Sequence, residues 1–135
     1  MKTVNIKQSI SFNCNPQDIY NILMDSKKHS KLTSSVAKIG KKEGDTFYVW
    51  GGDIHGINLE LIPNKKIIQS WRYNYPDWPK DYFSKVTFNI KDLKGKSKII
   101  FFHTGIPEKY AKDIANGWKE YYWTPMKELL SKLKV

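Results

Sequence analysis

The first twelve residues show a hydrophobic pattern with a period of two. Apolar side chains occupy the even positions from Val4 to Phe12, and Gln8 is the one polar residue among them. Successive side chains of a β-strand point to opposite faces, so this period predicts a half-buried strand. Gln8 then lies on the inner face of that strand, among apolar neighbours.

Two short helices are predicted to follow. Asn15 is a favourable N-cap residue, and Pro16 stands at the first helical position, where its missing backbone N–H is not needed. Ile19 and Leu23 recur at helical spacing and mark the buried side of the first helix. The second short helix is expected over Ser26–Leu32.

The middle of the chain is a series of apolar segments separated by short turns containing proline, asparagine and glycine. Connections this short join antiparallel neighbours, because parallel strands need a longer crossover. The predicted strands are Val36–Ile39, Lys65–Tyr73, Val86–Ile90 and Ile99–Phe102, together with a hairpin within residues 50–63.

The hairpin segment, WGGDIHGINLELIP, spans Trp50 to Pro63 and contains three glycines. We place its turn at His55-Gly56, because such a turn needs positive φ, which glycine adopts freely and histidine adopts more readily than most residues. A phosphate-binding loop does not fit, since no helix begins after the glycines. Asp53 and His55 share one side of the strand, but a solvated hairpin tip offers no pocket for a catalytic pair.

The period changes to three or four residues after Pro107. This spacing predicts one long amphipathic helix over Glu108–Leu133, roughly 25 residues in length. Gly117 is expected to permit close approach to the element beneath the helix. Pro125 is expected to bend the helix, because proline removes one backbone hydrogen bond.

These elements predict an α+β fold: a curved antiparallel β-sheet of about six or seven strands, wrapped on a long C-terminal helix, with two short helices after the first strand. An antiparallel sheet with one apolar face needs a cover, and only the last predicted helix is long enough. The length of 135 residues suits a single domain over residues 1–135.

The chain carries a formal net charge of +10, and Arg72 is its only arginine. Arginine is preferred for bidentate recognition of phosphate and guanine, so a charge made of lysines is weak support for nucleic-acid binding. The lysines are spread through turns and strand faces rather than gathered on one helix. They fit a solvated basic surface or an acidic protein partner, and we expect no nucleic acid.

Cysteine content and hydropathy indicate a soluble protein of a reducing compartment. Cys14 is the only cysteine, and no apolar run is long enough to cross a membrane. The first residues also lack the continuous apolar segment of a secretory signal. We expect a cytoplasmic monomer without membrane contact.

Aromatic residues concentrate on the strands and the helix that are predicted to face one another. Trp118 and Tyr122 lie one helical turn apart and should face the sheet together. One interpretation is ordinary core packing, and the other is a cavity for a small apolar ligand. The residues predicted to line that cavity are Trp71, Phe101, His103, Trp118, Tyr122 and Met126.

His103 should point inward, because it alternates with Ile99 and Phe101. An inward histidine in an apolar strand is usually a hydrogen-bonded structural residue, and Gln8 is a candidate partner. Orienting a ligand is the alternative. Catalysis would need an acid–base partner within reach, and the sequence suggests none, so we name no catalytic residue and expect no enzyme activity.

Metal binding is not expected either. Cys14, His29, His55 and His103 lie on different predicted elements and lack the spacing of metal ligands. We therefore predict neither a metal site nor a cofactor.

Trp78 lies between Pro76 and Pro79, in a loop too rich in proline to be a strand. A stiff loop that exposes tryptophan is a good protein-contact point, since interface anchors favour this residue. With Lys80 beside it, we predict a partner-binding site here. The alternative is that Trp78 folds back over the mouth of the cavity.

Four stretches of the sequence resemble one known family: GGDIHGINLELIPNKKIIQSWR, VTF, HTGIPEKY and NGWKEYYWTPMK. Together they resemble the C-terminal domain of the Hsp90-ATPase-activator family, within the wider START / Bet v 1-like helix-grip superfamily. The resemblance covers residues 8–133. It implies the helix-grip fold, in which a curved sheet holds a long helix.

The resemblance also implies a function. Family members of the eukaryotic cytosol bind the chaperone Hsp90 and stimulate its ATP hydrolysis, typically with two domains, of which the first engages the middle segment of Hsp90. This chain shows no trace of that first domain, so the resemblance implies contact with Hsp90 through the shared domain. Other single-domain relatives bind small apolar ligands, which is the alternative here, and a cyclase-type activity of distant helix-grip relatives is the third.

Overall fold

The computed structural model describes residues 1–132, and the predicted order of elements is confirmed. Within this range the strands form one antiparallel sheet in the order β1-β7-β6-β5-β4-β3-β2. The strands are β1 (Thr3–Phe12), β2 (Lys38–Ile39), β3 (Thr46–Val49), β4 (Ile54–Ile62), β5 (Lys66–Tyr73), β6 (Ser84–Asp92) and β7 (Ser97–Pro107).

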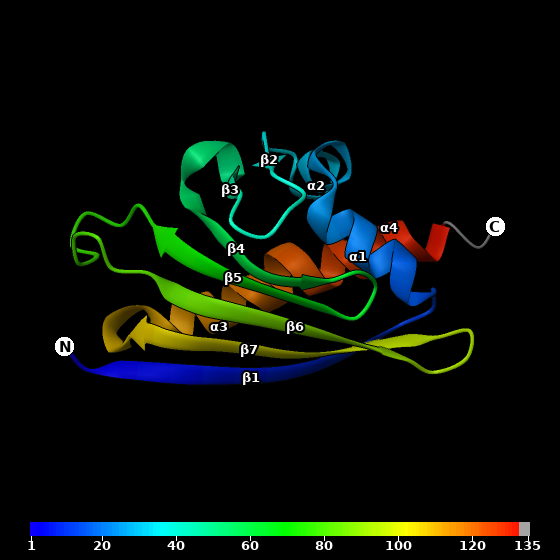
Figure 1. The fold of residues 1–135 in the computed structure, drawn as a ribbon. Helices are drawn as coiled ribbons and strands as arrows, with labels where there is room; N and C mark the ends of the chain where they lie inside the picture. The colour runs from blue at the N-terminus through cyan, green and yellow to red at the C-terminus, as the bar shows by residue number, and fades with distance from the viewer. Residues whose placement is uncertain (133–135) are drawn as a thin grey trace.

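The sheet curves around the C-terminal helix, which runs behind β5, β6 and β7 in Figure 1. Two short helices, α1 (Pro16–Met24) and α2 (Ser26–Thr33), close the other end of the sheet. The cap predicted for α1 is confirmed, because the Asn15 side chain accepts a hydrogen bond from the Asp18 N–H at 3.0 Å. The helix-grip architecture follows from these placements.

The C-terminal helix changes its hydrogen-bonding pattern three times. It begins as a 3₁₀ turn, η2 (Glu108–Tyr110), and continues as α3 (Ala111–Trp118), a π-helical turn η3 (Lys119–Trp123), and α4 (Thr124–Ser131). The predicted end, Leu133, lies outside the described residues.

The predicted irregularity at Pro125 takes the form of this π-turn. The Thr124 N–H donates to the Lys119 carbonyl, five residues earlier. Pro125 follows directly and has no N–H to donate. The widened turn thus precedes the position where the regular bonding pattern must be interrupted, and π-turns of this kind are frequent at functional sites.

The hairpin turn lies earlier than predicted. β3 and β4 are joined by η1 (Trp50–Gly52), and three successive residues there, Trp50, Gly51 and Gly52, have positive φ. His55 and Gly56 are not turn residues, because they pair with Tyr48 and Phe47 inside the β3–β4 ladder. The adjacent glycines adopt the required backbone conformation without strain, so the chain reverses there.

Gly56 has a different role from the one predicted. A Cβ atom at this position would lie 1.7 Å from the Ser70 carbonyl oxygen on β5. Glycine is therefore required by the close approach of two strands rather than by a turn. At Gly117 the opposite holds: a Cβ would meet nothing nearer than Tyr121 Cδ2 at 3.7 Å, so the close approach predicted there is wrong.

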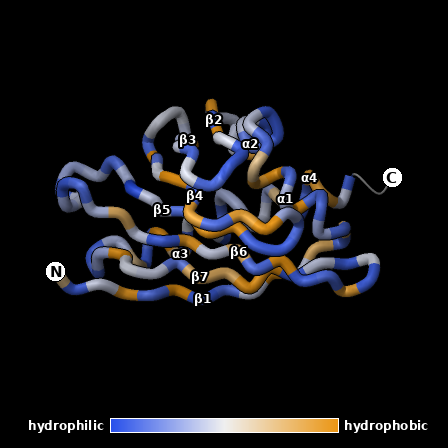
Figure 2. The backbone as a smooth tube through the Cα atoms, viewed as in Figure 1, coloured by the Kyte–Doolittle hydropathy of each residue, from blue (hydrophilic) through white to orange (hydrophobic). Residues whose placement is uncertain are grey.

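The core lies between the inner face of the sheet and the helices. Figure 2 shows hydrophobic residues recurring along the central strands and the helices. Ile67, Val86, Ile99 and Phe101 on three neighbouring strands are completely buried. None of the described helices is long and apolar enough to cross a membrane.

Candidate functional site

An open cleft of about 450 Å³ lies beside the C-terminal helix, where β5 ends and β4 begins. The sheet side contributes Trp50, Asp53, Ile54, Trp71, Tyr73 and Tyr75. The helix side contributes Asp113, Ile114, Gly117, Trp118, Tyr121 and Tyr122. A volume of this size falls within the range of small-molecule sites.

Aromatic rings form the walls of the cleft. The Trp71 ring packs against Trp118 with a centroid distance of 4.9 Å, and Trp118 packs against Tyr122 at 4.8 Å. At the mouth, Trp50 and Tyr121 meet edge to face at 5.7 Å. Gly117 leaves the helix side of the cleft open, because it has no side chain to fill the space between these rings.

Half of the predicted cavity residues line the cleft. Trp71, Trp118 and Tyr122 do so, whereas Phe101, His103 and Met126 are completely buried in the core behind them. Phe101 packs against the Trp118 ring at 4.4 Å, and such contacts fill the space directly beneath the helix. The interior void between the sheet and the short helices measures only about 10 Å³, which is too small for a ligand.

His103 is held by neutral partners on both ring nitrogens. The Trp118 indole N–H donates to Nδ1 at 3.0 Å, and Nε2 lies 2.8 Å from the Ser84 hydroxyl. Because the Ser84 hydroxyl donates to the Trp71 carbonyl, its oxygen accepts from Nε2–H, which defines the neutral tautomer. Burial lowers the pKa of His103 to about 3.

Gln8 does not partner His103, contrary to the prediction. Its side chain accepts from the Trp123 indole N–H at 2.6 Å and donates to the Ala115 carbonyl at 3.1 Å. Gln8 therefore ties β1 to two turns of the C-terminal helix. The polar interruption in the first strand is explained by this bridge.

A series of hydrogen-bonded polar side chains leads from the cleft into the core, and the pattern of the sequence did not predict it. The Trp50 indole donates to the Tyr122 hydroxyl at 3.2 Å, and that hydroxyl lies 2.9 Å from Nε2 of His29. His29 Nδ1 lies 3.1 Å from the Leu23 carbonyl, which can only accept, so Nε2 is the unprotonated nitrogen. Burial lowers the pKa of His29 to about 4, although the bond to Leu23 opposes this shift.

Two carboxylates stand at the rim of the cleft. Asp53 comes from the start of β4 and accepts a hydrogen bond from Asn74 Nδ2 at 2.8 Å. Asp113 comes from the first turn of α3. Neither was predicted to line a ligand site: Asp53 was considered only beside His55 at a solvated hairpin tip, and Asp113 was not considered. The fold alone brings both into the cleft with the aromatic rings.

Trp78 is not the exposed loop tip that was predicted. It is only 3% exposed, its indole N–H donates to the Tyr82 carbonyl at 2.8 Å, and it packs against Tyr73 at 5.2 Å. Tyr73 in turn lines the cleft, whereas Trp78 itself does not, so Trp78 packs behind the cleft wall and the alternative that it covers the mouth stays a prediction. Lys80, two residues later, is exposed.

Metal coordination has no support within residues 1–132. No group of three or more His, Cys, Asp or Glu side chains gathers there as a metal site would require. The residues that line the cleft offer stacking, apolar contact, hydrogen bonding and charge.

Comparison with known proteins places this architecture in a family. The family described as "Activator of Hsp90 ATPase homolog 1-like protein" matches residues 13–131. The chain belongs to this family.

Curated members of the Hsp90-activator family are similar over most of the chain. A Dictyostelium discoideum protein named "Activator of 90 kDa heat shock protein ATPase homolog" is 34% identical over 119 residues, which cover 87% of this chain and 30% of that protein. The human protein named "Activator of 90 kDa heat shock protein ATPase homolog 1" is 25% identical over 126 residues, which cover 93% and 37%. This chain thus spans 30% to 37% of the length of these two relatives.

Solved structures support the same fold for this Hsp90-activator-like chain. The crystal structure of an HSP90 activator from Plasmodium falciparum has a TM-score of 0.87 at 24% identity, covering 94% of this chain and 96% of that one. The solution structure of the Aha1 dimer from Colwellia psychrerythraea has a TM-score of 0.79 at 21% identity, with the same coverage. At such identities, the likeness establishes the fold.

Two of the four stretches that carry the family resemblance, residues 51–72 and 116–127, contribute residues to the cleft. Arg72 donates to the carbonyls of Tyr73 at 3.3 Å and Trp78 at 3.4 Å, which fastens the proline-rich loop. Gly105 has a φ of 74°, and its carbonyl accepts from the Tyr82 hydroxyl at 2.6 Å. Both contacts position the aromatic residues behind the cleft.

Proposed function

We propose that this chain binds Hsp90 and modulates its ATPase activity. The family match over residues 13–131 is the observation that carries this proposal, and the names of the curated relatives specify the partner. The formal net charge of +10 supports association with an acidic partner surface. The chain acts in the cytosol as a docking protein rather than as an enzyme.

The mechanism we propose is a shift of the conformational equilibrium of Hsp90. A bound protein changes an equilibrium only through a difference in its affinity for the two states. The chain therefore binds the closed state of Hsp90 more tightly than the open one. Faster ATP hydrolysis follows because the closed state is more populated.

A binding assay and a steady-state ATPase assay with the Hsp90 of the same organism test this proposal. We expect the chain to be retained by immobilised Hsp90 and to raise the rate of ATP hydrolysis. Absence of both retention and a rate change would end the proposal.

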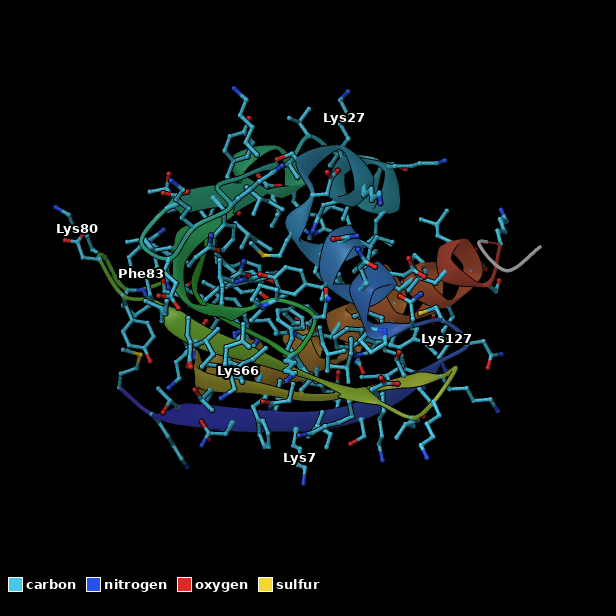
Figure 3. The ribbon with its side chains drawn as sticks, turned by 45° about the vertical axis from the view of Figure 1, so that its right-hand side comes forward. Lys7, Lys27, Lys66, Lys80, Phe83 and Lys127 are labelled. Atoms are coloured by element: carbon cyan, nitrogen blue, oxygen red, sulfur yellow. The ribbon has the colours of Figure 1, made fainter. Side chains whose placement is uncertain are left out.

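Matched charge reversals locate the contact. Lys80 projects from the β5–β6 loop and Lys27 from α2, in different parts of the molecule (Figure 3). We expect Lys80→Glu to weaken Hsp90 binding more than Lys27→Glu, although both change the net charge equally. Equal effects would remove the assignment of the Lys80 surface and leave binding itself standing.

A second candidate function is the binding of a small ligand in the cleft. The cleft of about 450 Å³, with its aromatic walls, favours this function. Entry of an uncharged aromatic probe, 4-phenylbutanol, should change the tryptophan fluorescence, because Trp50, Trp71 and Trp118 line the site.

A blocking variant provides the control. Gly117 lies on the cleft wall with open space beside it, so Gly117→Leu places an apolar side chain in the cleft. We expect this variant to fold and to lose the fluorescence change. Unchanged binding of the probe in the variant would place the ligand elsewhere.

A further inference from the structure

The rim of the cleft carries negative charge although the chain as a whole is strongly basic. Asp53 lies on the sheet side and Asp113 on the helix side. The two ion pairs among residues 1–132 are Lys2–Glu108 and Lys109–Asp77, so neither rim carboxylate is paired with a lysine of the described chain. Both carboxylates are exposed and remain available to a ligand at the mouth.

Aromatic rings line the same cleft as these carboxylates. Tyr121 is 51% exposed and stands edge to face with Trp50. On the other side of the mouth, Tyr75 stacks on Tyr110 at 4.1 Å. Tyr75 and Asp113 both line the cleft, and burial together with the Asp113 carboxylate raises the pKa of Tyr75.

Aromatic faces and carboxylates attract the same kind of group. The face of a tryptophan or tyrosine ring attracts a cation through its quadrupole, most strongly when water is excluded. A carboxylate attracts the same cation through its full charge. An apolar pocket with both features at its mouth therefore discriminates between ligands by the charge of their exposed end.

We propose that the cleft binds an organic cation, a molecule with an apolar body and a protonated amine or quaternary ammonium group at one end. The body lies against Trp71 and Trp118, and the nitrogen lies at the rim between Asp53 and Asp113. This inference rests on the proposed ligand-binding function of the cleft and specifies its ligand class.

The overall charge of the protein would by itself produce the opposite preference. With a net charge of +10, the long-range field of the molecule favours anions and disfavours cations. A preference for cations can therefore arise only from local groups at the cleft. Salt weakens the long-range field more than these short contacts, so the preference should persist at high ionic strength.

Three probes of matched length test the inference: 4-phenylbutylammonium, 4-phenylbutanol and 4-phenylbutyrate, each titrated into the full chain and followed by tryptophan fluorescence and calorimetry. We expect the ammonium probe to bind about threefold to tenfold more tightly than the alcohol, as exposed ion pairs and cation–π contacts together imply. The carboxylate probe should bind more weakly than the alcohol.

The variant Asp53→Asn/Asp113→Asn should lose most of the preference for the ammonium probe over the alcohol, because only the cation–π contacts remain. Asparagine keeps the shape of the side chain, and its carbonyl still accepts from Asn74. The control Glu120→Gln/Glu128→Gln changes the net charge equally at two exposed positions that do not line the cleft. It should keep the preference of the wild type, and melting temperatures verify that all variants fold.

Each failure has a separate meaning. If the alcohol and the ammonium probe bind wild type equally, or the carboxylate probe binds best, the charge inference is overturned while ligand binding stands. If the double asparagine variant keeps the full preference of the wild type, the assignment to Asp53 and Asp113 is overturned. If no probe binds at millimolar concentration, the ligand function and the inference fall together.

Discussion

Two buried histidines link distant parts of the chain through single hydrogen bonds. His103 on β7 accepts from Trp118 on the C-terminal helix, and His29 on α2 contacts Tyr122 one helical turn later. Both rings are neutral because burial disfavours their charged form. Their neutrality matters to these bonds: protonation of His103 Nδ1 would remove the acceptor of the Trp118 N–H, and protonation of His29 Nε2 would reverse the direction of its bond to the Tyr122 hydroxyl.

The stability of the protein should therefore decrease in mild acid. Below the usual histidine pKa of about 6.5, the unfolded chain takes up protons that the folded chain does not bind until about pH 4 at His29 and about pH 3 at His103. Stability is complete above pH 6.5 and is lost as the pH falls toward these values. Urea unfolding should show a loss of about 2 kcal/mol per histidine between pH 7 and pH 5.

Non-titrating variants identify the source of this loss. His29→Asn and His103→Asn should each be less stable than wild type at pH 7, and each should reduce the pH dependence. His55→Ala, at an exposed position, is the control for the loss of a histidine. A wild-type pH dependence in both asparagine variants would contradict the assignment.

At the scale of elements, two glycines serve opposite purposes. Gly56 allows β4 to approach the backbone of β5, whereas Gly117 stands in a helix beside open space. Helix interiors disfavour glycine relative to alanine because glycine loses more backbone entropy. The glycine in the helix thus maintains the cleft at a cost in stability, while the glycine in the strand is needed for the fold.

Alanine substitution should therefore have opposite effects at the two positions. Gly56→Ala forces a Cβ against the Ser70 carbonyl and should reduce the free energy of unfolding by about 3 kcal/mol or more. Gly117→Ala should increase it by about 0.5–1 kcal/mol. Thermal or urea unfolding measures both; a stable Gly56→Ala variant would mean that the two strands separate more easily than their pairing indicates.

At the scale of the whole molecule, positive charge is distributed over several faces. Lys7, Lys27, Lys80 and Lys127 project in different directions in Figure 3. This arrangement produces a long-range field rather than one defined anion site. Such a field accelerates encounter with an acidic partner without specifying the contact.

Association with Hsp90, as proposed, should consequently depend on salt mainly through its rate. The screening length falls from about 10 Å at 0.1 M salt to about 3 Å at 1 M, so steering over longer distances is lost. We expect the association rate constant to fall about tenfold over this range, with a smaller change in dissociation. Stopped-flow or surface-based kinetics measures both constants, and a salt-independent association rate would rule out electrostatic steering.

The hydrophobic periods predicted most of the fold because they record which face of each element is buried. The first strand, the capped helix at Pro16 and the long C-terminal helix followed from periods of two and between three and four. The hairpin turn was misplaced, because His55-Gly56 and Gly51-Gly52 both satisfy the local preference for positive φ. Strand pairing alone decided between them.

The candidate site was predictable only in part. Trp71, Trp118 and Tyr122 were identified because aromatic residues at core spacing face one another wherever the elements pack. Whether they enclose space depends on how completely their neighbours fill it, and Phe101 and Met126 fill the region beneath the helix. The opening therefore lies at the end of the sheet, where the pattern of the sequence gives no signal.

The sequence by itself determined the order of the elements, their buried faces and the basic charge, since each depends on residues close together in the chain or on composition alone. The tertiary structure decided the rest. Tyr122 meets His29 across 93 residues, and Asp53 and Asp113 reach one cleft from different elements. Such encounters depend on sheet curvature and helix placement, which arise from the packing of the whole core and leave no local trace in the sequence.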